Sequence, residues 1–387
     1  MIAYNTTWLN NLDVRREADN AAEQGCIEQQ ERDQIYIAYP AGFYSPNIFV
    51  RTGLFILTVV IVLFGLGLLS LLFLSAIESA VGGLVLFFGL LAYGALELMV
   101  KNGHYRSGVD DALLWTAAIC LVTGFNLLVN IPALGNAIII FLLTVLLFLR
   151  FTDALMAVAA ALALLAIVFF SIIKMGAAGR ALAPFVLMAA AALLYLFAQS
   201  LLKTAKWKPY HPGLQFVLVT ALVCFYLSGN YFVVREASLS MFGMELQPGH
   251  DIPLGWLFWI FTTVIPLAYI IRGLQKKDAV LLRVGLLLVA AIVFTVRYYY
   301  HVLPAETACV IGGVLFILLA WAVIRYLKTP KHGFTFKEQE EPFFMDKLHI
   351  ESLVIAQGFG GQQTSSHDGG IQFGGGSGGG GGASGEF

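Results

Sequence analysis

Charged residues are scarce in this chain. They make up 12% of its 387 residues, whereas hydrophobic residues make up 59%, and a typical soluble domain holds about 25% charged residues. A soluble fold could not hide so large an apolar share from water. The net charge is −1, so there is no basic excess that would indicate a nucleic-acid partner, and none is expected.

Cysteine is also rare, and no familiar catalytic motif is present. The four cysteines, Cys26, Cys120, Cys224 and Cys309, have no paired spacing, and three of them lie inside apolar runs. Neither a disulfide framework nor a zinc site is therefore indicated. The chain has no His-Glu-x-x-His, no Walker loop, no Gly-rich dinucleotide turn and no Gly-x-Ser-x-Gly in a strand-to-helix setting. No metal, cofactor or catalytic residue is expected.

Long apolar runs dominate the middle of the chain. Between residues 48 and 327, runs of roughly 18 to 25 apolar residues alternate with short polar connections. About 20 residues of helix cross a hydrocarbon layer of about 30 Å, and only helices or closed barrels satisfy the backbone in lipid. The pattern predicts an all-α, polytopic transmembrane helix bundle of about ten spans. These are expected at 50–75, 79–100, 109–130, 132–150, 153–173, 180–202, 213–234, 253–273, 279–300 and 304–326.

Some local features of the spans are also predicted. Arg150 and Asp153 are so close together that a tight turn at the interface is expected between the fourth and fifth spans. The Ala-rich stretches of the fifth and sixth spans, Ala157 to Ala166 and Ala181 to Ala192, favour a close approach of the backbones. Close helix packing is also expected at the glycines of the first two spans, Gly53, Gly65, Gly67, Gly82, Gly83, Gly89 and Gly94.

The Lys and Arg residues predict the orientation of the bundle. With the N-terminus in the cytosol, eighteen of the 23 basic residues fall on the cytosolic side. Four fall on the opposite side, Lys174, Arg180, Arg235 and Arg297, and Arg283 lies a turn inside the ninth span. This bias follows the positive-inside rule through all ten spans, so both termini are expected in the cytosol. The first 45 residues lack the pattern of a signal peptide, so the first span is expected to act as the insertion signal.

Residues 1–47 predict a small helical hairpin ahead of the first span. Asn5 or Thr7 can cap a first helix that ends at Gly25, and Ile27, Ile35 and Ile37 line a second one. So short a hairpin buries little apolar area, and it is expected to pack on the membrane-facing end of the protein or on a partner. A simpler interpretation is an amphipathic lead-in that orients the first span.

The phrase EQGCIEQQERDQI at residues 23–35, followed by Tyr39-Pro40 and many hydrophobic runs, resembles the opening of a bacterial family. The members of that family are predicted multi-pass membrane proteins that contain a domain of unknown function. They carry a short cytosolic segment in which a helix, a Gly, an apolar residue, polar residues, Gln or Glu, and Ile precede the first span. Cys26 departs from the family's usual aliphatic residue. The resemblance implies a bacterial origin and residence in the inner membrane, but no activity.

Two further segments follow the membrane region. Residues 328–357 mix charges with Phe, Leu and Ile, which predicts a cytosolic amphipathic segment lying on the headgroups. Residues 358–387 are so rich in Gly that we expect a disordered tail.

Polar residues inside the spans are the first candidates for a function. Asn126 and Asn230 are expected to hydrogen-bond to neighbouring helices. Glu97 and Arg283 lie at matching depths, one turn from the cytosolic side, and could form an intramembrane ion pair or extend separately to the interface.

A denser cluster is predicted on the outer side. It consists of Arg297, Tyr300, His301 and Glu306, with Glu236 in the preceding external region. Such a group could bind a small polar or cationic ligand or pass protons. Tyr and Arg at helix ends are also common anchors at the membrane interface. The alternative is therefore an interfacial aromatic belt that binds no ligand.

Three functions stay open on the sequence. The favoured one is an accessory or scaffold protein whose bundle positions the hairpin and the tail near a membrane or cytosolic protein partner. A small-solute transporter or channel is the alternative, although few polar residues lie near the membrane midplane. A lipid-acting interfacial enzyme is the third, and it rests on Arg297, His301 and Glu306 alone.

Overall fold

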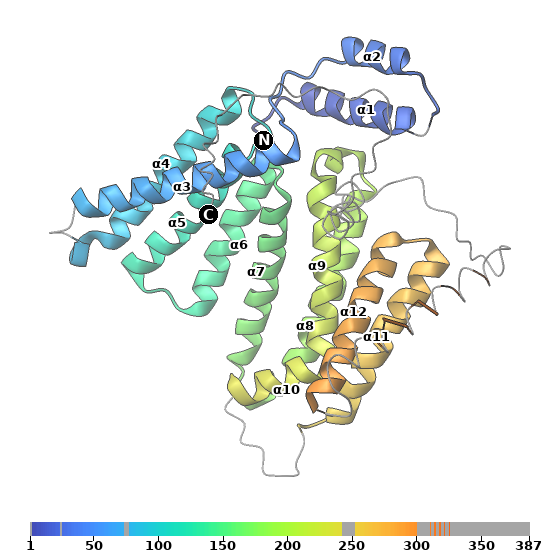
Figure 1. Ribbon diagram of the computed structural model, residues 1–387. Coiled ribbons are helices and arrows are strands. Elements are labelled where there is room, and N and C mark those ends of the chain that lie inside the picture. Colours follow the sequence, from blue (N-terminus) through green and yellow to red (C-terminus); the bar gives the residue numbers. More distant parts are fainter. Residues whose placement is uncertain are drawn as a thin grey trace, which may run out of the picture. The chain divides into compact units, whose positions relative to one another are not determined.

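The computed structural model describes residues 2–23, 25–72, 77–241 and 252–299, and seven separate positions between 310 and 325. Within these residues every regular element is a helix, apart from one isolated bridge between Tyr44 and His104. The elements in chain order are α1 (Thr6–Glu23), α2 (Gln29–Ala38), α3 (Ile48–Leu72), α4 (Ile77–Lys101), α5 (Val109–Val129), α6 (Ala133–Phe151), α7 (Ala154–Ile173), α8 (Ala177–Leu202), the 3-10 helix η2 (Ala205–Tyr210), α9 (His211–Gly229), α10 (Tyr231–Ser240), α11 (Gly255–Lys276) and α12 (Ala279–Tyr299) (Figure 1).

The predicted all-α membrane bundle is confirmed. Among the described residues, nine helices are long and apolar enough to cross a membrane, α3 to α9, α11 and α12. They correspond to the first nine predicted spans. Most of the tenth, at 304–326, lies outside the described residues, as do the segments 328–357 and 358–387.

The long helices expose large apolar side chains. Phe64 of α3 is 76% exposed, Leu71 of the same helix 69%, and Leu193 of α8 67%. Exposing side chains of this kind to water is unfavourable, whereas contact with lipid acyl chains is favourable. The chain is therefore a multi-pass membrane protein.

Neighbours in the sequence pack as antiparallel pairs. The closest pairs are α4 with α5, α6 with α7, α8 with α9, and α11 with α12, and α7 also contacts both α8 and α9. Part of each Ala-rich stretch predicted for the fifth and sixth spans is buried in these contacts, with Ala157 and Ala161 on α7 and Ala183 and Ala191 on α8. Small side chains let helix backbones approach closely in lipid.

Glycine makes one of these contacts especially close. A Cβ on Gly124 of α5 would lie 2.5 Å from the backbone nitrogen of Leu86 on α4, and a Cβ on Gly89 would lie 2.9 Å from the nitrogen of Leu121. Close packing was predicted for all the glycines of the first two spans. It holds for Gly82 and Gly89, and a Cβ on Gly65 would make an ordinary contact with the ring of Phe88 at 3.7 Å. It is wrong for Gly53, Gly67, Gly83 and Gly94, where a Cβ would meet nothing within 4 Å.

The predicted N-terminal hairpin is also confirmed. Asn5 caps α1, since its Oδ1 accepts hydrogen bonds from the backbone N–H of Thr7 (2.9 Å) and of Trp8 (3.3 Å). Gly25, at φ +70, follows the end of α1. The side chain of Arg15 then holds the two helices together, because it donates to the carbonyl oxygens of Tyr36 (2.8 Å) and Tyr39 (2.7 Å).

The segments on both sides of the hairpin are fixed to the ends of the spans. The backbone N–H of Ala3 donates to the carbonyl of Arg150 at the end of α6 (2.8 Å), and that of Tyr44 donates to Gly103 after α4 (2.9 Å). Tyr4 is only 7% exposed. Its ring lies edge-on to Tyr105 (4.9 Å between centroids) and to Phe43 (6.0 Å). We call this side of the spans the hairpin end.

A tight turn joins α6 to α7 at the hairpin end, as the closely spaced Arg150 and Asp153 predicted. Thr152 takes a left-handed conformation at φ +53. Asp153 then caps α7, since its Oδ1 accepts a hydrogen bond from the N–H of Met156 (2.8 Å). The reversal therefore needs only two residues between the helices.

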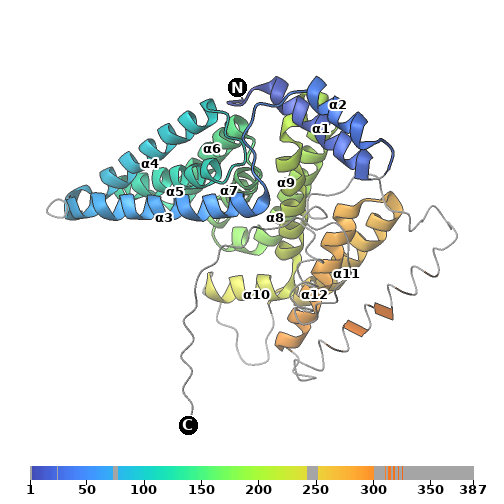
Figure 2. The same cartoon turned by 45° about the horizontal axis from the view of Figure 1, so that its top comes forward.

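The seventh predicted span, 213–234, does not run as one helix. α9 ends at Gly229, Asn230 is extended, and the chain continues as the short helix α10 across the end of α9 (Figures 1 and 2). The side chain of Asn230 favours this break because its Oδ1 caps α10 at the N–H of Val233 (3.2 Å). The apolar run continues through Val234, so hydropathy alone could not show it.

We predict that the stability of the protein depends on the close contact between Gly124 and Leu86. Gly124→Ala forces α4 and α5 apart, because its Cβ would overlap the backbone, and should cost about 1–3 kcal/mol. Gly94→Ala is the matched control and should leave stability unchanged or raised, because Ala is the better helix former. Thermal unfolding in mild detergent measures both. Equal melting temperatures for the two variants would contradict the close approach.

Candidate functional site

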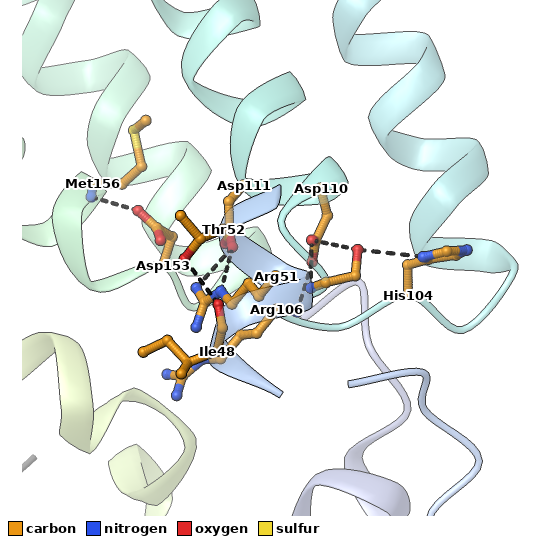
Figure 3. Close-up of polar contacts among 10 residues, drawn as sticks. Ile48, Arg51, Thr52, His104, Arg106, Asp110, Asp111, Asp153 and Met156 are labelled. Atoms are coloured by element: carbon orange, nitrogen blue, oxygen red, sulfur yellow. Dashed lines mark hydrogen bonds and ion pairs between the residues drawn. The ribbon is translucent and has the colours of Figure 1, made fainter. Parts of the chain in front are cut away.

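Polar side chains gather at the hairpin end, where α3 and α5 begin and α6 turns into α7. Figure 3 shows the carboxylates of Asp110, Asp111 and Asp153 in this region together with the side chains of Arg51 and Arg106. The side chain of Tyr4 reaches the same place from the N-terminal segment, since all but Arg51 line one small cavity with it. We call these six residues the hairpin-end cluster.

Asp110 organises the loop that precedes α5. Its side chain is buried, and Oδ1 accepts hydrogen bonds from the N–H (2.8 Å) and the hydroxyl (2.9 Å) of Ser107. Its Oδ2 accepts from the N–H of Arg106 (2.7 Å). Gly108, at φ +92, lets the loop pass directly beside Arg51 of α3, because a Cβ there would lie within 3 Å of the Arg51 carbonyl.

Asp111 joins the first turn of α5 to the first turn of α3. The Nε and Nη2 atoms of Arg51 both donate to its Oδ2, at 2.9 and 2.7 Å. The Asp111 side chain is 17% exposed and that of Arg51 34%. This ion pair is therefore half withdrawn from water, and removing one partner leaves a charge that is poorly solvated.

Asp153 brings a third carboxyl group close to the other two. Burial raises its pKa, and the nearby charge of Asp111 raises it further. The hydrogen bond from Met156 and the charges of Arg106 and Arg51 lower the pKa of Asp153 in part. The folded state therefore favours the protonated form of Asp153, and this contribution to stability is lost as the pH rises through its raised pKa.

The cavity at the centre of the cluster is small. Tyr4, Arg106, Asp110, Asp111 and Asp153 supply its ionisable lining, and its volume is about 20 Å³. A volume of this size holds about one water molecule. Burial raises the pKa of Tyr4, so its phenol stays neutral. The cluster can hold a water or a proton, but it has no room for a solute.

Glu97 forms a second ion pair at the hairpin end. Its carboxylate accepts from Nη2 of Arg150 (2.9 Å) and also from Nε, and the hydroxyl of Tyr93 donates to it (2.8 Å). The predicted pair of Glu97 with Arg283 is therefore wrong about the partner. Matching depth did not make the two residues neighbours, because Arg283 belongs to α12, which packs on α9 and α11.

The outer cluster predicted from the sequence is only partly described. Tyr300, His301 and Glu306 lie outside the described residues, so their convergence with Arg297 stays a prediction. The described part of this region is mainly aromatic. Tyr231 of α10 stacks on Trp259 (4.6 Å between centroids), and Arg235 lies 4.9 Å from the ring of Tyr299. Glu236 accepts a long hydrogen bond of 3.5 Å from Tyr299.

The two asparagines within the spans bond to other helices, as predicted. Asn126 of α5 donates to Oδ1 of Asn136 on α6 (2.7 Å). Asn230 donates to the hydroxyl of Thr295 on α12 (3.1 Å). On the far side of the break, the N–H of Tyr231 donates to the hydroxyl of Thr262 on α11 (2.9 Å). The bonds of Asn230 and Tyr231 hold α11 and α12 to the chain at the break in the seventh span.

Sequence reasoning missed the hairpin-end cluster. Arg51 and Arg106 were used only to predict the orientation, and Arg150 was used for the orientation and for the turn before Asp153. Asp110, Asp111 and Asp153 were not considered as a group. A signal was available, because acidic and basic residues occur together at three predicted helix ends on the same side of the membrane. Across the described ranges, no three His, Cys, Asp or Glu side chains are placed to hold a metal ion.

Comparisons with known proteins give no match among protein-family models, curated proteins or solved structures. What the chain does is therefore inferred from its own geometry. The resemblance of residues 23–35 to a bacterial membrane family stays a prediction.

We predict that Arg51 is needed mainly to compensate Asp111. Arg51→Ala leaves Asp111 without its cation beside two other carboxyl groups, so this variant should lower the melting temperature more than Asp111→Ala does. The double variant should melt above Arg51→Ala, because it also removes the uncompensated charge. The measurement is thermal unfolding in mild detergent.

The more accessible pair of Asp13 and Arg16 on α1 is the control. It is an i,i+3 pair whose side chains are 26% and 48% exposed, so its coupling should stay below about 0.5 kcal/mol. If the double variant at Arg51 and Asp111 melts at or below Arg51→Ala, the two charges are not the coupled pair that we describe.

Proposed function

We propose that this chain is an accessory or scaffold protein of a bacterial cytoplasmic membrane, with both termini in the cytosol. In this proposal the nine described spans are the anchor, and the N-terminal hairpin is the surface that meets a membrane or cytosolic protein partner. The excess of Lys and Arg on the hairpin side supports the orientation. The resemblance of residues 23–35 supports the bacterial origin.

The observation that carries the proposal is the way the hairpin is held. A flexible lead-in would need no specific contacts with the spans. This segment is bonded at both of its ends, through Ala3 and Tyr44, and Tyr4 anchors it in a buried aromatic cluster. Holding the N-terminal segment in one conformation costs conformational entropy, and these contacts with the spans offset that cost.

The second helix of the hairpin remains accessible. α2 has no buried residue, and its Ile37 is 81% exposed. An anchored helix with an exposed apolar side chain suits a protein contact, because little further ordering is needed on binding. The cavity of the hairpin-end cluster, in contrast, is too small for a substrate, so these polar groups support the anchor and not a reaction.

A small-solute transporter is the second candidate, and the break at Asn230 favours it. Interrupted helices often form substrate sites in transporters. Here the Asn230 amide and the N–H of Tyr231 already bond to Thr295 and Thr262, so a solute would have to displace these partners. The lipid-acting enzyme depends on His301 and Glu306, which lie outside the described residues.

Photo-crosslinking in living cells tests the scaffold proposal. A photoreactive amino acid at Ile37 should give one adduct of defined mass with another protein. The same amino acid at Met175, which is 65% exposed in the connection of α7 to α8, should not give it. Tyr4→Ala removes the aromatic anchor, so it should abolish the adduct from Ile37 while the protein stays in the membrane.

Labelling of Cys26 is the control for orientation. Cys26 is exposed in the turn of the hairpin, so a membrane-impermeant maleimide should label it in inverted vesicles and not in intact cells. Cys26→Ser shows the background from the other cysteines. Labelling of Cys26 in intact cells, or an adduct from Ile37 that Tyr4→Ala leaves unchanged, would refute the proposal.

A further inference from the structure

An apolar pocket lies at the end of the spans opposite the hairpin. It has a volume of about 330 Å³ and is formed by α7, α8, α9 and α10. The wall includes Phe169, Pro184, Leu187, Cys224 and Ala237. A site of this volume suits a small molecule or part of a larger one.

The wall offers a ligand almost no polar partner. Its two serines, Ser228 and Ser238, donate their hydroxyls to carbonyls within their own helices, at 2.8 and 2.7 Å. Apolar cavities of this kind do not hold water stably. A pocket left empty would lose the dispersion contacts of its whole lining. An apolar occupant is therefore required.

The position of the pocket along the spans shows whether it opens to water or to lipid. Pro184 lies about 10 Å along α8 from the start of the helix, and Cys224 about 8 Å from the end of α9, at 1.5 Å per residue. Both are just inside the hydrocarbon layer. Two of the lining side chains, Leu227 and Met241, are 40% and 57% exposed, so the pocket is open to its surroundings. At this depth the surroundings are acyl chains.

The short helix α10 closes the outer side of the pocket. Val233, Val234, Ala237 and Ser238 line it, together with Met241 directly after the helix. The spacing of the first four places them on one face of α10. The break at Asn230 is what turns that face toward α7 and α8, so the interruption of the seventh span has a structural consequence. The pocket exists because the seventh span stops early.

Basic side chains accompany the pocket at the level of the headgroups. Lys174 follows the last residue of α7, Arg180 lies in the first turn of α8, and both side chains are exposed. Arg180 is about one helical turn from the lining residue Pro184, and Lys174 is five residues from the lining residue Phe169. Exposed cations next to an apolar pocket complement the phosphate of a lipid whose chain fills that pocket.

We propose that this pocket binds one acyl chain of an anionic phospholipid, with Lys174 and Arg180 attracting its headgroup. The proposal is independent of the scaffold role, because the hairpin and the pocket lie at opposite ends of the spans. The lipid would fill the space between α7 and α10 and hold the interrupted span in place.

Photoreactive lipids test the proposal on the whole protein in lipid nanodiscs. A phosphatidylglycerol with a diazirine on its acyl chain should label peptides from α7, α8, α9 and α10 that contain lining residues. The corresponding phosphatidylcholine should label them much less. Lys174→Gln combined with Arg180→Gln should remove this difference between the two lipids.

Filling the pocket provides the matched pair of variants. Ala237→Trp occupies the space from α10 and should reduce labelling of the pocket peptides to the level of other lipid-facing segments. Leu193→Trp changes α8 at a side chain outside the pocket and should leave the labelling unchanged. If Ala237→Trp does not fold, Ala166→Phe fills the same pocket from α7.

Three results would overturn the proposal. The first is an adduct pattern in the wild-type protein that is spread evenly over the lipid-facing helices. The second is equal labelling by the two lipids. The third is undiminished labelling after the pocket has been filled, which would place the bound chain elsewhere.

Discussion

The hydrocarbon layer cannot solvate a charge or an unpaired backbone group, and the organisation of this chain depends on that constraint. Two ion pairs lie at the ends of spans, Arg51 with Asp111 and Arg150 with Glu97. Two amide side chains deeper in the spans, Asn126 and Asn230, bond to other helices. The same bonds that make these groups tolerable in a membrane also decide which helices are neighbours.

Arg150 shows how this constraint extends to the N-terminal segment. Its side chain neutralises Glu97 on α4, while its carbonyl accepts the backbone N–H of Ala3. The turn that follows brings Asp153 toward the start of α3 and α5, where Arg51 and Asp111 meet. The end of α6 thus connects the first spans to the hairpin, and the position of the hairpin is a consequence of how charge is accommodated.

The sequence was sufficient to predict those features that depend on neighbouring residues in the chain. Apolar run length predicted the spans, Asn5 and Gly25 predicted the limits of α1, and Arg150 with Asp153 predicted a turn. It was insufficient to predict features that depend on contacts with helices far away in the chain. Gly94 and Gly124 look alike in the sequence, yet only Gly124 faces a helix backbone. Glu97 could be paired correctly only after the neighbours of α4 were known, and the break at Asn230 depends on Thr262 and Thr295 from other helices.

The central claim is that the N-terminal segment is fixed to the ends of the spans, and hydrogen exchange in nanodiscs tests it most directly. The amides of Ala3, Tyr44 and Tyr105 are bonded across this contact, so they should exchange far more slowly than unstructured amides. Tyr4→Ala, which removes a buried ring between Phe43 and Tyr105, should release this protection without affecting the spans. Exchange of these amides at unstructured rates in the wild-type protein would contradict the account.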